Sequence, residues 1–340
     1  MTRTLVLAAA LFVAQVATGA ELVVYTYDSF VSWGPAQAIE RVFEAAHPGV
    51  DLVWVAPGDS SEMLARLIAE QQAGGTEADV FLGIADVELP RALARGALQT
   101  YDARLVPNLA DVPADLMFDD TGHAIPFDHG YVTFVYDAQA LPRELVPRTL
   151  EDLTRPELRG KIILEDPRTS SPGLSFLLWT VAHFGEEGWA DFWRALLPNV
   201  LTVTKGWSEA YQMFEAGEAP IVLSYSTDTA YSYLASGSVR YQVVTPGGEA
   251  FRQVEGMALV AGTDQPALAH AFLNLVLSKD IQERIPTSQW MFPASAAAEL
   301  PEAFREHAVV PDRAVSLPPD YVAEHLESWL NRWQQVLVGG

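Results

Sequence analysis

The chain has 340 residues, of which 49% are hydrophobic and 19% are charged, a composition typical of a folded globular protein. Its formal net charge of −23 disfavours nucleic acid and other polyanions as partners. It contains no cysteine, which excludes disulfide bonds, thiolate metal sites and cysteine nucleophiles.

The first 20 residues have the pattern of a secretory signal peptide. Arg3 gives a positive start, an apolar run extends from Leu5 to Val16, and small residues precede Glu21. We predict cleavage after Ala20. The run is shorter than the roughly 20 residues that span a bilayer, so the alternative is a buried N-terminal helix. Because no cysteine is available for lipid attachment, we expect a free periplasmic protein.

Strand and helix patterns alternate in the first part of the mature chain. A helix at 35–46 starts at a proline, and Asp59 precedes a second helix that ends near Gly74. A short helix is expected at 87–94. Short β-branched runs predict strands at 22–26, 50–55 and 79–83. This alternation predicts a parallel sheet covered on both faces.

The alternation starts again after residue 130. Helices are expected after Ser171, after Trp207, at 267–277 and at the C-terminal end, 320–337. Strands are expected at 130–137, 161–166, 201–204, 220–225, 241–245 and 254–262. We therefore predict two α/β units that separate near 120–130, with a return crossing near 250–260.

Common catalytic motifs are absent. The sequence has no HExxH, no GxSxG, no GxxxxGK[ST] and no GxGxxG after a strand. The seven histidines are scattered, which disfavours a dedicated zinc site. The sequence therefore favours a binding protein over an enzyme, and we predict neither catalytic residues nor a metal site.

Aromatic and polar residues instead gather at the ends of the predicted elements. In open α/β sheets, ligands bind outside the carboxyl ends of the strands. Each residue also has a structural alternative: the large aromatics are equally consistent with core packing, and Ser171 and Asp59 are consistent with helix N-caps. A capped helix start also offers free N–H groups to an anion. The residues are Tyr27, Asp28, Trp33, Asp59, Ser170, Ser171, Trp207, Tyr225, Tyr231 and Trp290.

Several longer segments resemble the periplasmic thiamine-binding proteins of ABC importers: VYTYDSF, PFDHGY, DPRTSSPG, TVTKGWSEAY and IPTSQWMFP. The resemblance implies an α/β group II periplasmic-binding fold, with two lobes joined by two crossover segments and a ligand cleft between them. The N-terminal lobe would comprise 21–125 plus about 255–295. The C-terminal lobe would comprise 126–254 plus about 296–340.

The resemblance also implies the ligand and its contacts. The ligand would be thiamine, with its mono- and diphosphate, and no cofactor. Asp28 or Asp59 would balance the ligand's charge, and Asp228 adds a further charge near Tyr231. The hydroxyl or phosphate end would lie near Ser170, Ser171 and Gly173. The aromatic contacts would be Tyr27, Trp207, Tyr225, Tyr231 and Trp290. The partners would be an ABC permease and its ATPase, and the protein would act as a monomer.

Two alternatives stay open. A protein of this fold could bind ferric iron, a polyamine or a phosphonate instead, although Tyr225 and Tyr231 are not the adjacent tyrosine pair of an iron site. A secreted enzyme that cleaves thiamine is the other alternative. The thiamine-degrading relative of this fold uses a cysteine nucleophile, which this chain lacks.

Overall fold

One mixed sheet of 12 strands organises residues 19–339, the part of the chain that the computed structural model describes. Its main path runs β2-β1-β3-β10-β5-β8-β6-β7, while β4 and β12 pair with β10, and β9 and β11 pair with β5. The strands are β1 (Ala20–Tyr25), β2 (Val50–Val55), β3 (Val80–Ala85), β4 (Leu98–Gln99), β5 (Ala124–Asp137), β6 (Ile162–Glu165), β7 (Val200–Thr204), β8 (Ile221–Tyr225), β9 (Tyr241–Val244), β10 (Glu249–Val260), β11 (Phe292–Pro293) and β12 (Arg313–Val315).

The two-lobe α/β fold predicted from the sequence is confirmed, and every predicted strand has a counterpart. The prediction of a parallel sheet is wrong at its centre. β1 pairs in parallel with β2 and β3, and β6 does so with β7 and β8. In contrast, β10 runs antiparallel to both β3 and β5, and β5 runs antiparallel to β8. The signal-peptide prediction falls on residues 1–20, of which 1–18 lie outside the described residues.

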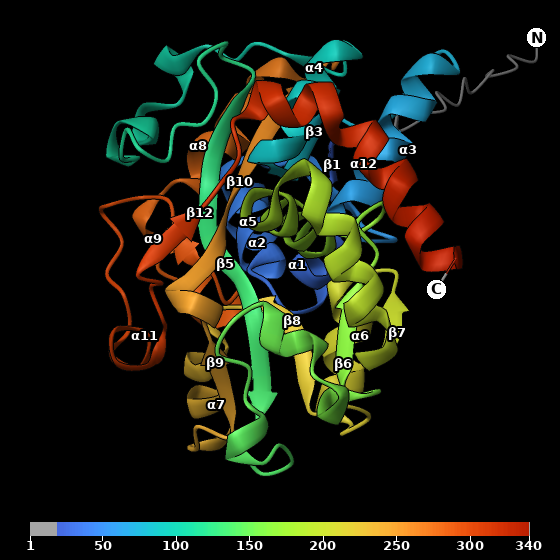
Figure 1. Cartoon of the computed structure of the whole chain (residues 1–340). Helices are drawn as coiled ribbons and strands as arrows, with labels where there is room; N and C mark the ends of the chain where they lie inside the picture. The colour runs from blue at the N-terminus through green and yellow to red at the C-terminus, as the bar shows by residue number, and fades with distance from the viewer. Residues whose placement is uncertain (1–18, 340) are drawn as a thin grey trace, which may run out of the picture.

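The two longest strands, β5 and β10, connect the halves of the molecule. They run side by side from the Ala124–Ala258 pair to the Val132–Phe251 pair, and β5 then continues into the second half (Figure 1). β5 was expected only over 130–137, because Pro126 and Gly130 interrupt its pattern, yet it begins at Ala124. The ladder between the two strands shifts register between Glu255 and Gly256. Such an irregularity bends and twists a strand pair locally.

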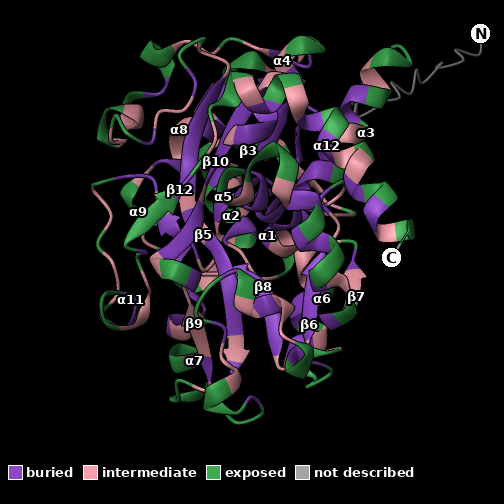
Figure 2. Ribbon diagram, viewed as in Figure 1, coloured by how far each residue is buried: buried purple, intermediate pink, exposed green. Residues whose placement is uncertain are grey.

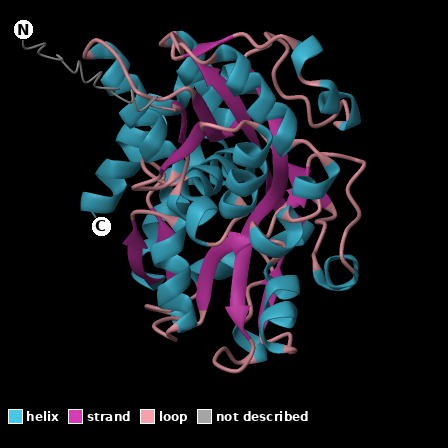
Figure 3. Ribbon diagram, turned by 180° about the vertical axis from the view of Figure 1, so that it is seen from behind, coloured by secondary structure: helices cyan, strands magenta, loops and turns pink. Residues whose placement is uncertain are grey.

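Helices cover both faces of the sheet, as the opposite views of Figures 1 and 3 show. They are α1 (Asp28–Ser32), α2 (Ala36–Ala46), α3 (Ser60–Gln72), α4 (Leu89–Ala94), α5 (Ser171–Leu196), α6 (Trp207–Glu215), α7 (Asp228–Ser236), α8 (Pro266–Val276), α9 (Lys279–Gln282), α10 (Ile285–Ser288), α11 (Glu302–His307) and α12 (Pro319–Gly339). None of the helices within residues 19–339 combines the length and the apolar character needed to cross a bilayer.

The core follows the strands, which are buried along most of their length, whereas the outer faces of the helices are exposed (Figure 2). On one side, Phe30, Phe43 and Phe127 pack among β1, β3 and α8. On the other, indole rings join α5 to α12, where Trp193 lies edge-on to Trp333 at 5.7 Å. Because α12 also packs against α4, it contacts helices of both predicted lobes. The exact lobe boundaries stay a prediction.

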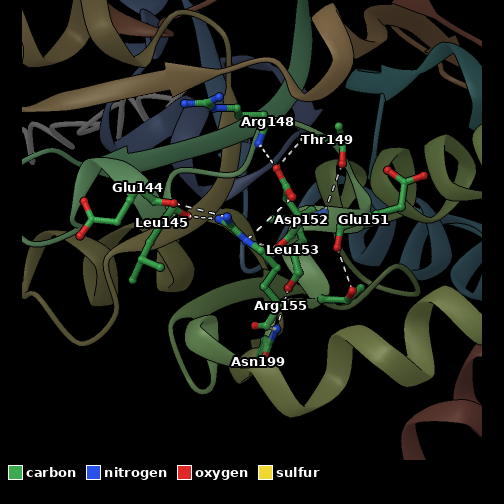
Figure 4. A network of polar contacts seen from close by, with 10 residues as sticks. Glu144, Leu145, Arg148, Thr149, Glu151, Asp152, Leu153, Arg155 and Asn199 are labelled. Carbon is green, nitrogen blue, oxygen red and sulfur yellow. Dashed lines mark hydrogen bonds and ion pairs between the residues drawn. The ribbon is translucent and has the colours of Figure 1, made fainter.

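A polar network at the rim of the second half shows how its loops are anchored (Figure 4). The side-chain amide of Asn199, just before β7, donates to the carbonyl oxygens of Leu153 and Arg155 at 2.7 and 2.8 Å. The Arg155 guanidinium in turn donates to the carbonyl of Leu145 at 2.7 Å. Asn199 is buried. Its amide therefore satisfies the Leu153 carbonyl and is a second donor to the Arg155 carbonyl, which also accepts from the Leu158 N–H at 3.0 Å.

We expect Asn199→Ala to lower the free energy of unfolding by about 1–3 kcal/mol, because the Leu153 carbonyl loses the Asn199 donor while the Arg155 carbonyl keeps the Leu158 N–H. Chemical denaturation followed by circular dichroism measures this loss. The control is Arg148→Ala, since the exposed Arg148 side chain points away from the network (Figure 4) and its loss should change stability by less than about 0.5 kcal/mol. Equal effects of the two substitutions would contradict the assignment.

Candidate functional site

A small cavity lies where the two halves meet. Its walls come from the ends of β1 and β8, from the starts of α3, α5, α6 and α7, from β10 and from the α10–β11 connection. The enclosed volume is about 40 Å³, far below the roughly 300–1,000 Å³ of a typical ligand site. Side chains must therefore move apart to admit a ligand. The lining residues are Tyr27, Ser29, Trp33, Asp59, Ser171, Pro172, Trp207, Tyr225, Asp228, Glu255, Ser288, Gln289, Trp290 and Met291.

Tyr27 forms part of the cavity floor at the end of β1. Its buried hydroxyl donates to Glu255 at 2.6 Å and accepts from the Gln289 amide at 2.5 Å. Its ring lies directly over Gly83, where a Cβ atom would come within 2.3 Å of the ring. Gly83 also has a φ of +104°, a backbone conformation that favours glycine. The two hydrogen bonds of the Tyr27 hydroxyl and the space above Gly83 together fix the position of the Tyr27 ring.

Trp207 opens α6 and brings an indole ring from the second half to the cavity. Its ring stacks on Tyr211, one helical turn later, with centroids 4.7 Å apart and planes 22° apart. Its indole Nε1–H donates to the Ser224 hydroxyl at 2.9 Å. Both contacts hold the ring at the cavity instead of in the core. Tyr211 was not predicted, although its spacing of four residues from Trp207 is a readable signal.

Trp33 brings an aromatic ring from the first half. It meets Trp207 edge-on at 5.9 Å and Tyr231 at 6.0 Å. The sequence identified it only as a residue at an element end, because the loop around it gives no periodicity. Its ring bridges the two halves, so it must shift relative to Trp207 when they separate.

Trp290 has an unusual backbone. It is the only residue other than glycine with positive φ in 19–339, at +61°. Such a conformation is uncommon for a bulky residue and is found preferentially at functional sites. The Thr227 hydroxyl donates to the Trp290 carbonyl at 2.5 Å, and the Trp290 ring packs edge-on to Tyr231 at 4.7 Å. The surroundings thus hold Trp290 against the cavity.

Asp59 is shared by two helix starts from opposite sides of the cavity. Its Oδ1 accepts from the backbone N–H of Ser60 at 2.7 Å as the N-cap of α3. Its Oδ2 accepts from the backbone N–H of Trp207 at 3.2 Å, at the start of α6. A Cβ at Gly206 would lie 3.0 Å from Oδ2, so glycine leaves room for the carboxylate. Asp59 is therefore a hydrogen-bonded link between the halves.

The floor of the cavity is a hydrogen-bonded chain around Gln253 of β10. The Gln253 amide donates to the Tyr225 hydroxyl at 3.0 Å and to Glu255 at 2.8 Å. Its carbonyl oxygen accepts from Ser175 at 2.9 Å. Glu255 lies opposite Asp128 in the β5–β10 ladder, next to the register shift. The register shift between β5 and β10 therefore lies next to the hydrogen-bonded floor of the cavity.

The cavity is rich in carboxyl groups and has no basic side chain in its lining. Burial raises the pKa of Asp59 to about 6 and the pKa of both Asp228 and Glu255 to about 7. Burial also raises the pKa of Asp128 and of Glu165 behind the cavity. Asp59 retains some solvent exposure, but the protein atoms around it are dense enough to disfavour its charge.

The predicted site residues divide into two groups. Those that line the cavity are Tyr27, Asp59, Ser171, Trp207, Tyr225 and Trp290. Those outside its lining are Asp28, Ser170, Gly173 and Tyr231.

Each residue of the second group has an identifiable position. Asp28 accepts from the Ser208 hydroxyl at 2.8 Å and lines a neighbouring hollow of about 220 Å³ that also reaches Asp59. Ser170 is the N-cap of α5. Gly173 lets α5 approach β6, since a Cβ there would lie 2.6 Å from the Glu165 carbonyl oxygen. Tyr231 lies behind Trp33 and Trp290 and donates to Glu215 at 2.7 Å.

Some lining residues were missed. Glu255 lies within a strand whose run of apolar residues gave no sign of a ligand contact, and Asp228 was noted only as a nearby charge. The lining residues that the sequence did not single out are Ser29, Pro172, Glu255, Ser288, Gln289 and Met291, whereas Trp33 was identified only as a residue at an element end.

The cavity chemistry suits a flat cation. Aromatic faces attract cations and stack on flat heteroaromatic rings, and the buried carboxyl groups favour positive charge. Among residues 19–339, no three His, Cys, Asp or Glu side chains gather closely enough to hold a metal ion. Nor do the two tyrosines considered for iron share a partner: Tyr225 bonds to Gln253 and Tyr231 bonds to Glu215.

Comparisons with known proteins agree on one family. The model described as "Bacterial extracellular solute-binding protein" matches residues 76–312. The thiamine-binding periplasmic protein of Escherichia coli (strain K12) is 36% identical over 317 residues, 93% of each chain. A solved periplasmic thiamin binding protein matches with a TM-score of 0.84 and 35% identity over 96% of this chain and 99% of that one. A ferric binding protein from Campylobacter jejuni, 20% identical, matches in fold with a TM-score of 0.72 over 93% of this chain and 99% of that one.

The raised pKa values predict how stability depends on pH when no ligand is bound. Unfolded carboxyl groups titrate near pH 4, so between about pH 4 and pH 7 the folded protein holds more protons than the unfolded chain. The free energy of unfolding should therefore fall as pH rises through this window. Each unit by which a pKa is raised contributes about 1.4 kcal/mol. Denaturant titrations at about pH 5 and about pH 7.5 measure the difference.

The double variant Asp228→Asn, Glu255→Gln serves as the control for this prediction. It removes two of the groups whose pKa is raised to about 7, so its stability should depend less on pH. A parent protein whose stability increased from about pH 5 to about pH 7.5 would refute the electrostatic description of the cavity.

Proposed function

The chain belongs to the bacterial extracellular solute-binding proteins, and we propose that it captures thiamine between its two lobes and delivers it to an inner-membrane ABC permease. The relatives that are at least 30% identical over nearly the whole chain are named as thiamine-binding periplasmic proteins. The single observation that carries the proposal is a cavity with walls of indole and phenol rings and buried carboxyl groups that lack a basic partner.

The aromatic rings provide the binding surface for both parts of thiamine. Its thiazolium ring carries a fixed positive charge, which gains roughly 0.5–2 kcal/mol over an aromatic face. Its aminopyrimidine is flat, and stacking between rings buries both of its faces at about 25 cal/mol per Å². Trp33 and Trp207 come from opposite sides, so they can close on such a ligand together.

The polar groups orient the ligand. Asp59 and Glu255 lie on the cavity wall and can accept from the exocyclic amino group. The Ser171 hydroxyl is buried at the start of α5 without a partner among the described residues, and it suits the hydroxyl end of thiamine or the phosphate of its esters. Asp28 borders the adjoining hollow, where it adds negative charge to the entrance.

Capture requires no bond to be made or broken, so we propose that the protein is not an enzyme. Binding is coupled to closure of the lobes about the β5–β10 pair, and the permease recognises the closed shape. The protein would act as a monomer in the periplasm, with the permease and its ATPase as partners. The three carboxyl groups of the cavity lining would also suit a polyamine, but its aromatic rings suit a flat ring better than an aliphatic chain.

The proposal is tested by titrating the purified mature protein with thiamine and following tryptophan fluorescence. Because three indole rings line the cavity, we expect saturable quenching at or below about micromolar ligand. Mass spectrometry of ligand released from freshly purified protein provides a second test. A protein that releases no thiamine and shows no saturable change would refute the proposal, and a coloured ferric complex would favour the iron alternative.

We expect Trp207→Leu to weaken thiamine binding by about 10- to 100-fold, because it removes a stacking face and a cation-binding surface. Isothermal titration calorimetry measures the change. Trp54→Phe is the control, since Trp54 lies outside the cavity and bonds to Glu40 at 3.1 Å, and it should bind thiamine as the parent does. If Trp207→Leu bound thiamine with the parent's affinity, the ring would not be a ligand contact.

A further inference from the structure

Asp228 is a buried carboxyl group, and one of its two oxygens lacks a hydrogen-bond partner among the described residues. It is the first residue of α7, lines the cavity and is only 2% exposed. Its Oδ2 atom is buried and has no hydrogen-bond partner among the described residues. A buried carboxylate without full hydrogen bonding is costly, and such groups call for a functional explanation.

The other two acids of the cavity lining are already engaged. Asp59 uses one oxygen for Ser60 and the other for Trp207, so both cap helix starts. Glu255 accepts from Tyr27 with one oxygen and from Gln253 with the other. Among the described lining residues, Asp228 is therefore the carboxyl group with an oxygen left for a ligand.

Asp228 is also linked to the Trp207 ring through hydrogen bonds of Ser224. Trp207 donates its indole N–H to the Ser224 oxygen, which leaves the Ser224 hydroxyl proton free for Asp228. The Ser224 bond stabilises the ionised carboxyl group and so opposes the effect of burial on its pKa. The Trp207 ring and the Asp228 carboxyl group are thus held next to each other, where both can contact one bound cation.

An ordinary structural role does not account for this arrangement. An acid in the first turn of a helix is favourable, and Asp228 accepts from the Ser224 hydroxyl and the Tyr225 backbone N–H, but its Oδ2 atom still lies buried without a partner among the described residues. The titratable groups that face Asp228 are two acids, Glu165 of β6 and Glu215 of α6, and two phenols whose raised pKa keeps them neutral, Tyr211 of α6 and Tyr231 of α7. No basic group is among them.

We propose that Asp228 is a specificity-determining residue, which supplies the counter-charge for the cationic ring of the ligand and makes the site prefer a flat organic cation to its neutral isostere. This inference rests on the proposed function, since it concerns the same cavity. It assigns to one side chain the charge selectivity that a thiamine-binding site needs.

Asp228→Asn tests the proposal, because it keeps the size of the side chain and removes its charge. The ligands are thiamine, its isolated N-methylated thiazolium half, and the corresponding thiazole without the N-methyl group, which is neutral. We expect the variant to lose about 10- to 100-fold in affinity for thiamine and for the thiazolium, and less than about twofold for the neutral thiazole. Calorimetry measures all three, and thermal melting checks that the variant is folded.

Glu218→Gln is the matched control. Glu218 is exposed and lies on the same half of the molecule, so its substitution removes one charge from the surface and should change each affinity by less than about twofold. Retained thiamine affinity in Asp228→Asn would overturn the inference, and so would an equal loss for charged and neutral ligands. A parent protein without a preference for the thiazolium would also overturn it. In contrast, a parent protein that binds the thiazolium but not thiamine would refute only the proposed function.

Proton release gives an independent readout. Burial raises the pKa of Asp228 to about 7, so a bound cation should expel a proton from this group near pH 6.5. Titrations of the parent in two buffers of different ionisation enthalpy should report this release, and Asp228→Asn should release fewer protons. Equal release by the two proteins would contradict the role of Asp228.

Discussion

Negative charge buried beneath aromatic rings, without a basic side chain to neutralise it, is the constraint on which this structure depends. Asp59, Asp228 and Glu255 all lie on the cavity wall. Each would be unfavourable in an apolar interior, and the fold compensates in different ways: backbone N–H groups surround Asp59, while a phenol and an amide donate to Glu255. The compensation is incomplete at Asp228. In our proposal an organic cation completes it, so that ligand binding and the electrostatics of the site are coupled.

The same contacts that shape the cavity also join the two halves of the molecule. Asp59 caps helices on both sides, Tyr27 bonds to Glu255 beside the register shift, and the rings of Trp33 and Trp207 meet across the cavity. In the proposed function, closure of the two lobes and assembly of the binding site therefore occur together. With about 40 Å³ enclosed, a ligand must replace contacts between the halves with its own. The binding free energy is the difference between two sets of ring and carboxylate contacts, and it need not grow with the buried area alone.

Local patterns determined what could be predicted from the sequence. β2 at 50–55 and the Asp59 cap of α3 depend on residues close in the chain, and the sequence predicted both. The pairing of β5 with β10 joins residues more than one hundred positions apart, and Pro126 and Gly130 disguise the strand, so neither its length nor its direction was predicted. In the site, residues at strand ends were recognised because turns expose them. Glu255 was missed because burial inside a strand cannot be read from its neighbours. The thiamine ligand itself came from the resemblance of whole segments, not from periodicity.

The raised pKa values and the preference for a cation have a common physical origin. Removing water from a carboxyl group penalises its charge, and near neutral pH a proton relieves that penalty. A cation that fits the cavity relieves it as well, and it also gains the faces of Trp207 and Trp33, which a proton cannot use. A neutral ring of the same shape gains the aromatic faces but leaves the acids protonated or unsatisfied. In the proposed site, selectivity for charge thus arises without a preformed ion pair: the protein leaves one oxygen of Asp228 without a partner, and a ligand with the right charge and shape supplies it.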